Sequence, residues 1–148
     1  MLKRLLETDR NDLAGFVARV FLGIVMFPHG AQKMLGWFGG HGFSATMGFF
    51  GSMGIPPVFA FLAIFAEFFG ALGVIFGFLT RVAAFGIGMV MLVAMTAVHL
   101  PNGFFAQQNG IEFTLILFGV ALAVMIKGGG RWSLDELLMR VLSNRTQG

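Results

Sequence analysis

Six ionisable side chains lie inside or beside long apolar stretches of the 148-residue chain, and they are its first candidates for chemistry. They are Arg19, His29, Lys33, Glu67, His99 and Glu112. On insertion scales an ionisable side chain at the centre of a membrane helix costs about 2.5–3.5 kcal/mol, so each position needs a reason. A cation or an imidazole can hold a carbonyl oxygen, and imidazole and carboxylate groups can exchange protons.

The composition indicates that these stretches lie in a membrane. Hydrophobic residues make up 57% of the chain and charged residues 11%, whereas about 25% of residues are charged in ordinary globular proteins. The chain has no cysteine and no tyrosine, which excludes thiolate nucleophiles, iron–sulfur clusters, cysteine-ligated zinc and a phenolic acid. The net charge is only +3, and the basic residues flank apolar stretches. We therefore predict a lipid bilayer, and no nucleic acid, as a partner.

Four apolar stretches are long enough to cross a bilayer, which takes about 20 residues. They cover 13–35, 56–78, 81–100 and 111–126, and the last of them is short enough to need a residue or two more at each end. Backbone groups in lipid must be hydrogen-bonded internally, and stretches of this length meet that requirement as helices. We predict one all-α integral membrane domain over residues 1–148, built as a four-transmembrane-helix bundle.

The distribution of Lys and Arg predicts the orientation of the bundle. Apart from Arg19 and Lys33 within the first span, these residues occur before that span, at the 79–81 turn and after the fourth span, and they are absent from the 36–55 and 101–110 connections. By the positive-inside rule both termini are cytoplasmic and both long connections face outward. The outer 36–55 connection is rich in glycine and aromatic residues, which fits either a lid or a connector that rests among the lipid headgroups.

A short cytoplasmic helix is predicted after the last span, over about 133–142. Ser133 and Glu136 have the spacing of a capping box. An apolar stripe follows, made of Leu134, Leu137, Leu138, Val141 and Leu142. The pattern is typical of an interfacial amphipathic helix, and it also fits a contact for a partner protein. Near the start of the chain, Asp12 is the expected N-cap of the first span.

One face of each of the first two spans collects the unusual residues. At 100° per residue, Arg19, His29 and Lys33 share a face of the first span with two glycines. Glu67 lies on the small-residue face of the second span, opposite most of its phenylalanines, so we expect it to point into the bundle. From the depths of the two residues in their spans we predict an ion pair between Arg19 and Glu67.

Four of the six ionisable residues gather toward the outer side. His29, Lys33, His99 and Glu112 lie near outer span ends, which predicts a polar pocket open to the outside and closed below by the predicted ion pair. Structural interpretations stay open. The ion pair could serve only to set helix register, and Lys33 could simply extend its side chain to the membrane interface. His99 and Glu112 could be ordinary interfacial residues. No Glu-x-x-His or His-x-x-x-His spacing occurs, so no metal site is predicted.

The order of these residues along the chain resembles that of the DoxX family. The similarity runs from about residue 13 to residue 135 and is carried by the whole series rather than by one motif. The series is Arg19, Gly23, His29-Gly30, Lys33-Met34, Glu67, Gly70, Gly77, Thr80-Arg81, His99, Gly103-Phe104-Phe105, Glu112 and Ser133-Leu134-Asp135. The resemblance implies a small four-helix protein of the prokaryotic cytoplasmic membrane that serves as an oxidoreductase component. It also implies similarity to the quinone-reducing membrane subunit of thiosulfate:quinone oxidoreductase.

We therefore expect a membrane oxidoreductase component that binds a quinone, or a similar small molecule, in the outer pocket. The expected binding residues are His29, Lys33, Glu67 and Arg19, and the expected proton-exchanging residues are His29, His99 and Glu112. No redox centre is evident in the chain itself. Its electrons must come from a bound cofactor or from a partner, and in the second case we expect the chain to be a subunit of a quinone-linked oxidoreductase.

Two other classes of function remain open. Buried charges also mark solute and proton paths, so a small-solute or proton carrier is one alternative. The other is a structural anchor that docks a soluble oxidoreductase through the 133–142 helix. The Gly73-x-x-x-Gly77 spacing fits either a contact in a homo-oligomer or packing within the bundle.

Overall fold

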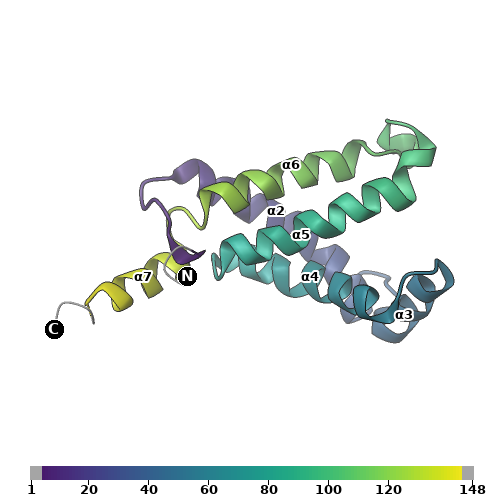
Figure 1. Cartoon of the computed structure of the whole chain (residues 1–148), viewed down its shortest axis with the longest axis horizontal. Helices are drawn as coiled ribbons and strands as arrows, with labels where there is room; N and C mark the ends of the chain where they lie inside the picture. The colour runs from purple at the N-terminus through teal and green to yellow at the C-terminus, as the bar shows by residue number, and fades with distance from the viewer. Residues whose placement is uncertain (1–4, 145–148) are drawn as a thin grey trace.

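The computed structural model describes residues 5–144, a stretch built from helices without any strand. Four helices form the bundle: α2 (Leu13–Met34), α4 (Pro57–Phe76), α5 (Thr80–Ala94) and α6 (Glu112–Lys127). A shorter helix, α3 (Gly42–Ser52), lies in the connection between α2 and α4, and α7 (Leu134–Asn144) follows α6 (Figure 1). The predicted all-α fold is confirmed.

The described chain begins and ends at the same end of the bundle (Figure 1). We call this the terminal end, and it comprises residues 5–12, 77–80 and 128–144. The opposite end, which we call the loop end, comprises residues 35–56 and 95–111. Here α5 continues into a π-helical turn (Met95–His99) and a 3-10 turn (Leu100–Asn102), and a second 3-10 turn covers Ala106–Gln108.

Three helices of the described chain are long and apolar enough to cross a membrane. They are Leu13–Met34, Pro57–Phe76 and Thr80–Asn102, the last of which includes the irregular turns that extend α5. The fourth predicted span corresponds to α6, whose 16 residues reach about 24 Å at 1.5 Å per residue. That is shorter than the roughly 30 Å of a hydrocarbon core.

The packing of α2 on α4 depends on two glycines of α2. A Cβ atom on Gly30 would lie 2.6 Å from the Cα atom of Phe68, and one on Gly23 would lie 3.0 Å from the carbonyl oxygen of Ala71. Only a residue without a side chain permits such close approach of two helices. These contacts set the register of the pair and place Glu67 level with Gly30.

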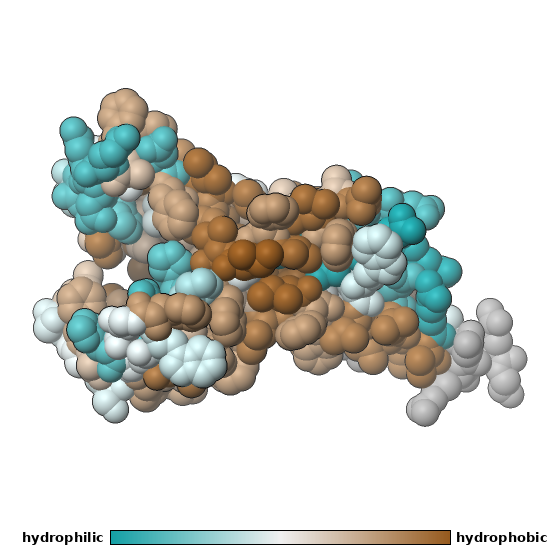
Figure 2. Space-filling model, turned by 180° about the vertical axis from the view of Figure 1, so that it is seen from behind, coloured by the Kyte–Doolittle hydropathy of each residue, from teal (hydrophilic) through white to brown (hydrophobic). Residues whose placement is uncertain are grey.

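Side-chain size increases from the inside of the bundle to its surface. The core holds mainly small and medium residues, which include Ala60, Ala71, Ala84, Ala121, Ile64, Val74 and Ile87. The exposed set includes Phe21, Phe59, Phe69, Phe85, Ile116 and Ile126, and the space-filling view shows a broad apolar surface along the bundle (Figure 2). A surface of this kind is suited to lipid. The Gly73-x-x-x-Gly77 spacing is used inside the chain, because these glycines pack against Ala83 and Ser133.

Arg19 is buried at the terminal end and only 1% exposed. A guanidinium group has five N–H donors, and here all five meet backbone carbonyls. They run from Nε to Gly129 O (2.6 Å), from Nη1 to Val74 O (2.9 Å) and Ile75 O (2.5 Å), and from Nη2 to Trp132 O (2.8 Å) and Arg131 O (3.3 Å). Two of these carbonyls belong to the last turn of α4, where they have no helical partner and where a cation is favourable.

The predicted ion pair between Arg19 and Glu67 is therefore wrong. The prediction set the ends of the two spans level, whereas the glycine contacts shift α4 along α2. Arg19 consequently lies beside the end of α4, and Glu67 lies about three turns further along α2, level with Gly30. The expectation that Glu67 points into the bundle is confirmed, since it is 3% exposed.

The segment that follows α6 caps the start of α5 through a buried carboxylate. Asp135 is 1% exposed and accepts hydrogen bonds from Leu79 N (2.7 Å), Thr80 N (2.9 Å) and Thr80 Oγ1 (2.7 Å). A negative charge at a helix N-terminus is stabilising. Within the predicted capping box, Ser133 Oγ accepts from Glu136 N (3.2 Å) as expected, while the Glu136 carboxylate pairs with Arg140.

Two more side chains cap helices at the terminal end. Arg81 donates to the last carbonyls of α6, at Met125 (2.8 Å) and Ile126 (2.7 Å). Asp12 accepts from Gly15 N (2.8 Å) and is the N-cap of α2, as predicted. This bond from the Gly15 N–H lowers the pKa of the Asp12 carboxyl below its ordinary value. The terminal end is thus closed by charged groups that satisfy helix ends.

Replacing Asp135 tests this closure. Asp135→Ala leaves two backbone N–H groups and a hydroxyl without their acceptor, so we expect it to lower the unfolding free energy by about 2 kcal/mol or more. Asp135→Asn keeps one acceptor oxygen and should lose less. The measurement is unfolding of the detergent-solubilised protein by denaturant. Asp9→Ala, at an exposed carboxylate, is the control and should change stability by less than about 0.5 kcal/mol. Wild-type stability in Asp135→Ala would contradict the capping role.

Candidate functional site

Glu67 forms an ion pair with Lys33 near the loop end. Lys33 Nζ lies 2.5 Å from Glu67 Oε2, and the two side chains are 27% and 4% exposed. A carboxylate this deeply buried needs a nearby cation, because its desolvation costs several kcal/mol. The pair joins the last turn of α2 to the middle of α4. The Glu67 carboxylate is therefore buried, whereas part of the Lys33 side chain is accessible from outside the protein.

The close contact at Gly30 explains why this pair forms. Because a backbone-to-backbone approach occurs there, the residue one turn later on α2 projects over the face of α4 that carries Glu67. Thr46 on α3 lies beside this turn: its hydroxyl donates to Gly42 O at 2.8 Å and its oxygen is 3.5 Å from the Lys33 carbonyl oxygen. The turn that carries Lys33 therefore lies next to α3 as well as α4, on a helix end fixed by glycine packing.

His29 lies one turn before Lys33 on α2 and is exposed although it belongs to a membrane-span candidate. Its ring centroid is 6.0 Å from that of Phe113, the second residue of α6. The charges of Lys33 and Glu67 are close enough to act on the imidazole. We call His29, Lys33 and Glu67 the loop-end cluster. The structure brings these three predicted site residues together.

A notch separates two lobes at the loop end. One lobe is formed by α3 and the connection from α2 to it, and the other by the 100–111 connection between α5 and α6. Figure 2 looks onto the side of the molecule where α2 lies, and it shows hydrophilic surface inside the notch. The exposed positions of the loop-end cluster, on the last two turns of α2, are placed to meet this notch.

His99 and Glu112 hold the second lobe together. His99 Nδ1 lies 2.8 Å from the carbonyl oxygen of Asn109, and Glu112 Oε2 accepts from Ala106 N at 2.9 Å. Within the described residues neither side chain hydrogen-bonds to the loop-end cluster. The predicted gathering of four polar residues is thus found for His29 and Lys33 only, together with Glu67. Arg19 lies at the opposite end with every donor engaged, so it is not part of this cluster.

Sequence reasoning missed the residues that shape the lobes. Asn109 has φ 60° and ends the 3-10 turn that folds the 100–111 connection, and the π-helical turn at Met95–His99 shifts the end of α5. Pro101, two residues after His99, marked an end of the helix, but nothing in the local sequence indicated the π turn. No three His, Asp or Glu side chains in residues 5–144 come together in a group that could hold a metal ion.

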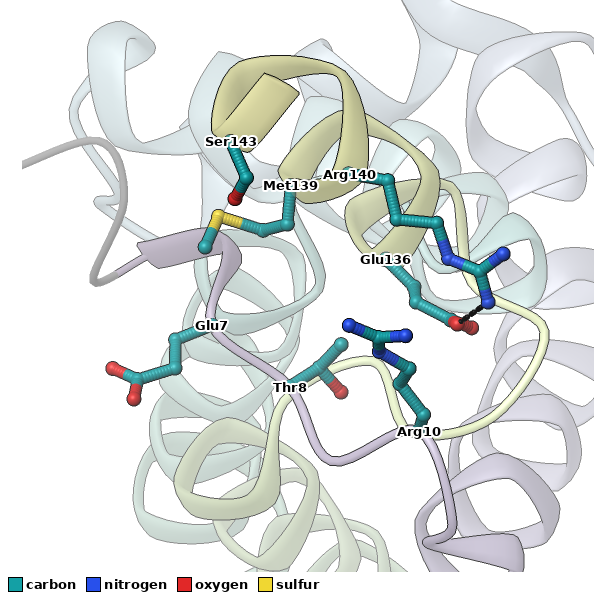
Figure 3. Close-up of a pocket in the computed structure, with 7 residues that line it drawn as sticks. All are labelled: Glu7, Thr8, Arg10, Glu136, Met139, Arg140 and Ser143. Atoms are coloured by element: carbon teal, nitrogen blue, oxygen red, sulfur yellow. Dashed lines mark hydrogen bonds and ion pairs between the residues drawn. The ribbon is translucent and has the colours of Figure 1, made fainter. Parts of the chain in front are cut away.

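Two further hollows lie at the terminal end. A solvent-open cavity of about 370 Å³ separates the first residues from α7 (Figure 3). It is lined by Glu7, Thr8, Arg10, Glu136, Met139, Arg140 and Ser143. An apolar groove of about 220 Å³ runs along α7, lined by Phe78, Leu134, Leu137, Leu138 and Val141. The cavity has two acidic and two basic side chains, so it favours no sign of charge, and we place the candidate site at the loop-end cluster.

The ion pair can be tested by a double-mutant cycle. Because Lys33→Met leaves the buried Glu67 carboxylate without its cation, we expect this replacement to cost roughly 3–5 kcal/mol. Glu67→Ala removes the buried charge and leaves only the partly exposed Lys33 ammonium, but it also leaves a space in the core. Glu67→Gln, which keeps a hydrogen-bond acceptor, should cost less. The double variant Lys33→Met/Glu67→Gln should lose less unfolding free energy than its two single variants lose together, by at least about 1 kcal/mol. Strict additivity in denaturant unfolding, or equal stability of the Gln and Ala variants, would show that the two charges do not interact.

Comparisons with known proteins show the family of this chain. The family model named DoxX matches residues 14–100, more than half of the chain. The chain is 34% identical over 131 residues to "Inner membrane protein YqjF" of Escherichia coli (strain K12), covering 86% of this chain and 94% of that protein. It is 27% identical over 133 residues to "Putative oxidoreductase CatD" of Bacillus subtilis (strain 168), covering 90% and 92%. No solved structure matches the chain. The chain therefore belongs to the DoxX family.

Proposed function

We propose that this protein is a component of a quinone-linked oxidoreductase in the prokaryotic cytoplasmic membrane, and that the loop-end cluster binds the quinone head group. The observation that carries the proposal is the Lys33–Glu67 ion pair, buried on the carboxylate side and open on the lysine side. The family supplies the membrane setting. The oxidoreductase class comes from the name of the Bacillus relative, and the relative from Escherichia coli is named as an inner membrane protein.

In this proposal the chain crosses the membrane four times, with both termini in the cytoplasm. Three span candidates alone would leave the chain ends on opposite sides, whereas the described chain begins and ends at one end of the bundle. A return through α6 is consistent with that arrangement, and a bilayer accommodates a helix of 16 residues by local thinning. Lys and Arg flank the terminal end and are absent from 36–55 and 101–110, which favours a cytoplasmic terminal end.

The residues of the loop-end cluster suit a carbonyl ligand. The Lys33 ammonium has three N–H donors, of which Glu67 engages one, so donors remain on the exposed side. His29 adds an exposed imidazole one turn away. When bound, a quinone would accept two electrons and two protons and become the quinol. Lys33 and His29 would then hold carbonyl oxygens, while Glu67 holds the Lys33 ammonium in place.

Proton exchange in this proposal uses His29 on α2, with His99 and Glu112 on the facing lobe. Glu112 precedes Phe113, whose ring contacts His29, so the lobe begins next to the cluster. Such groups contribute to proton transfer when they lie within reach of the ligand directly or through water. Cysteine and tyrosine are absent from the chain, and the electrons come from a partner protein or from a bound cofactor.

A second candidate function has one observation in its favour. The apolar stripe of α7 is exposed, with Leu134 and Val141 at 42% and 54%, and α7 points away from the bundle (Figure 1). A stripe of this kind suits a soluble oxidoreductase that the protein would anchor to the membrane. This role and quinone binding use opposite ends of the molecule and are compatible.

Organic extraction of the detergent-purified protein, followed by mass spectrometry, tests quinone binding. We expect about one quinone per chain in the wild type. Lys33→Met and His29→Ala each remove a hydrogen bond that involves a charged or polar donor, so the bound amount should fall roughly ten-fold. His41→Ala, at an exposed histidine of the outer connection, is the matched control and should retain its quinone. Phospholipid alone in the wild type, or equal quinone in all four proteins, would refute the proposed function.

A further inference from the structure

Helix α6 leaves the last turn of α2 uncovered on one side. His29 lies level with Phe113, the second residue of α6, because their rings are 6.0 Å apart. Helix α2 continues for five residues after His29, to Met34, whereas α6 begins only one residue before Phe113. The turn of α2 that carries Lys33 therefore extends past the start of α6.

The connection that precedes α6 folds onto itself. Ile111 N donates to Gly103 O (3.0 Å) and Glu112 N donates to Phe104 O (2.9 Å). The His99 and Glu112 side chains bind the backbone of the same connection. The lobe is thus a self-contained unit, and its separation from the α3 lobe is the notch visible in Figure 2.

The surface that leads away from this opening is apolar on both helices. Phe21 on α2 lies two turns before His29, and Ile116 on α6 lies three residues after Phe113. Viewed down each helix at 100° per residue, Phe21 lies about 80° from His29 and Ile116 lies about 60° from Phe113. Their exposed fractions are 64% and 60%, and Phe113 itself is 44% exposed. In a bilayer such residues contact acyl chains, so the opening beside the cluster continues into lipid.

The α3 lobe beside the notch carries exposed aromatic side chains, whereas the 100–111 lobe also exposes Asn102, Gln107 and Gln108. Trp37, Phe38 and Phe49 are 54%, 61% and 60% exposed, and His41 is the only ionisable residue of the 36–55 connection. Exposed Trp and Phe without charged neighbours are typical of the membrane interface rather than of a surface that admits water-soluble ions. The α3 side of the notch is therefore suited to a ligand that arrives from the bilayer.

We propose that the loop-end cluster is reached sideways from the outer leaflet, past the start of α6 at Phe113 and over the last turn of α2, which carries Lys33. The ligand class is an amphiphile with a hydrogen-bond-accepting head and a long apolar tail. The head enters to Lys33, and the tail stays in lipid along Phe21 and Ile116. The identification of this amphiphile as a tailed quinone rests on the proposed function above, whereas the route rests on the position of α6 against α2.

Photo-crosslinking in liposomes tests the route. The probe is a dimethoxy-methyl-benzoquinone whose ten-carbon tail ends in a diazirine, and the competitor is the same molecule without the diazirine. We expect crosslinks that the competitor suppresses, located on residues 21–25 of α2 and 113–120 of α6. Suppressible crosslinks confined to α3 or to the 100–111 connection would overturn the sideways route and leave quinone binding intact. No suppressible crosslink anywhere would overturn both the route and the proposed function.

Substitutions at Phe113 supply a second readout that does not depend on crosslinking yield. Phe113→Trp narrows the opening and should slow exchange of the bound probe at least about five-fold, whereas Phe113→Ala widens it and should speed exchange. Phe85→Trp, at a 56% exposed position of α5, is the matched control and should exchange at the wild-type rate. Unchanged exchange in both Phe113 variants, with melting temperatures retained, would contradict a passage beside this residue.

Discussion

The structure depends most on the complete engagement of the Arg19 guanidinium. Its five hydrogen bonds tie the end of α4 to the segment that follows α6, and α2 supplies the side chain. A buried guanidinium is tolerated only if its donors are satisfied, and carbonyls at a helix end are tolerated only if they find donors. One residue answers both requirements. Asp135, which caps α5 from the same segment, adds the opposite charge nearby.

The two ends of the bundle therefore differ in what their charges can do. At the terminal end the cations Arg19 and Arg81 bind helix carbonyls, so their donors serve the fold. At the loop end the cation Lys33 has one partner and an exposed side, so donors remain for a ligand. The difference follows from register, because Gly23 and Gly30 fix how far α4 slides along α2. The same register brings Glu67 to Lys33 and removes it from Arg19.

Local patterns in the sequence predicted much of this fold. The composition predicted a helical membrane protein, Asp12 and Ser133 were predicted as caps and found as caps, and the small-residue face around Glu67 correctly indicated that it points inward. The cation paired with Glu67 was predicted incorrectly. Which residue of α2 faces Glu67 depends on contacts between two helices, and the sequence periodicity of each helix contains no information about their relative shift.

The same distinction explains the rest of the candidate site. His29 and Lys33 share a helix face, which their spacing predicts, and the structure brings both to Glu67. His99 and Glu112 bind the backbone of their own connection, and this depends on a π turn and a left-handed Asn109 that composition and periodicity do not signal. The hydrogen bonds of His99 and Glu112 stabilise the fold of this connection, and their roles in proton exchange are part of the proposed function.

Disulfide crosslinking in the membrane is the most direct test of the register on which this account rests. The chain has no cysteine, so two introduced cysteines report on one contact without background. Phe27 and Phe68 have ring centroids 5.8 Å apart, and we expect Phe27→Cys/Phe68→Cys to form a disulfide when an oxidant is added. Val20 lies two turns before Phe27 on the same face of α2, so the pair Val20→Cys/Phe68→Cys should stay reduced. Crosslinking of the Val20 pair instead of the Phe27 pair would place Glu67 beside Arg19 and contradict the account.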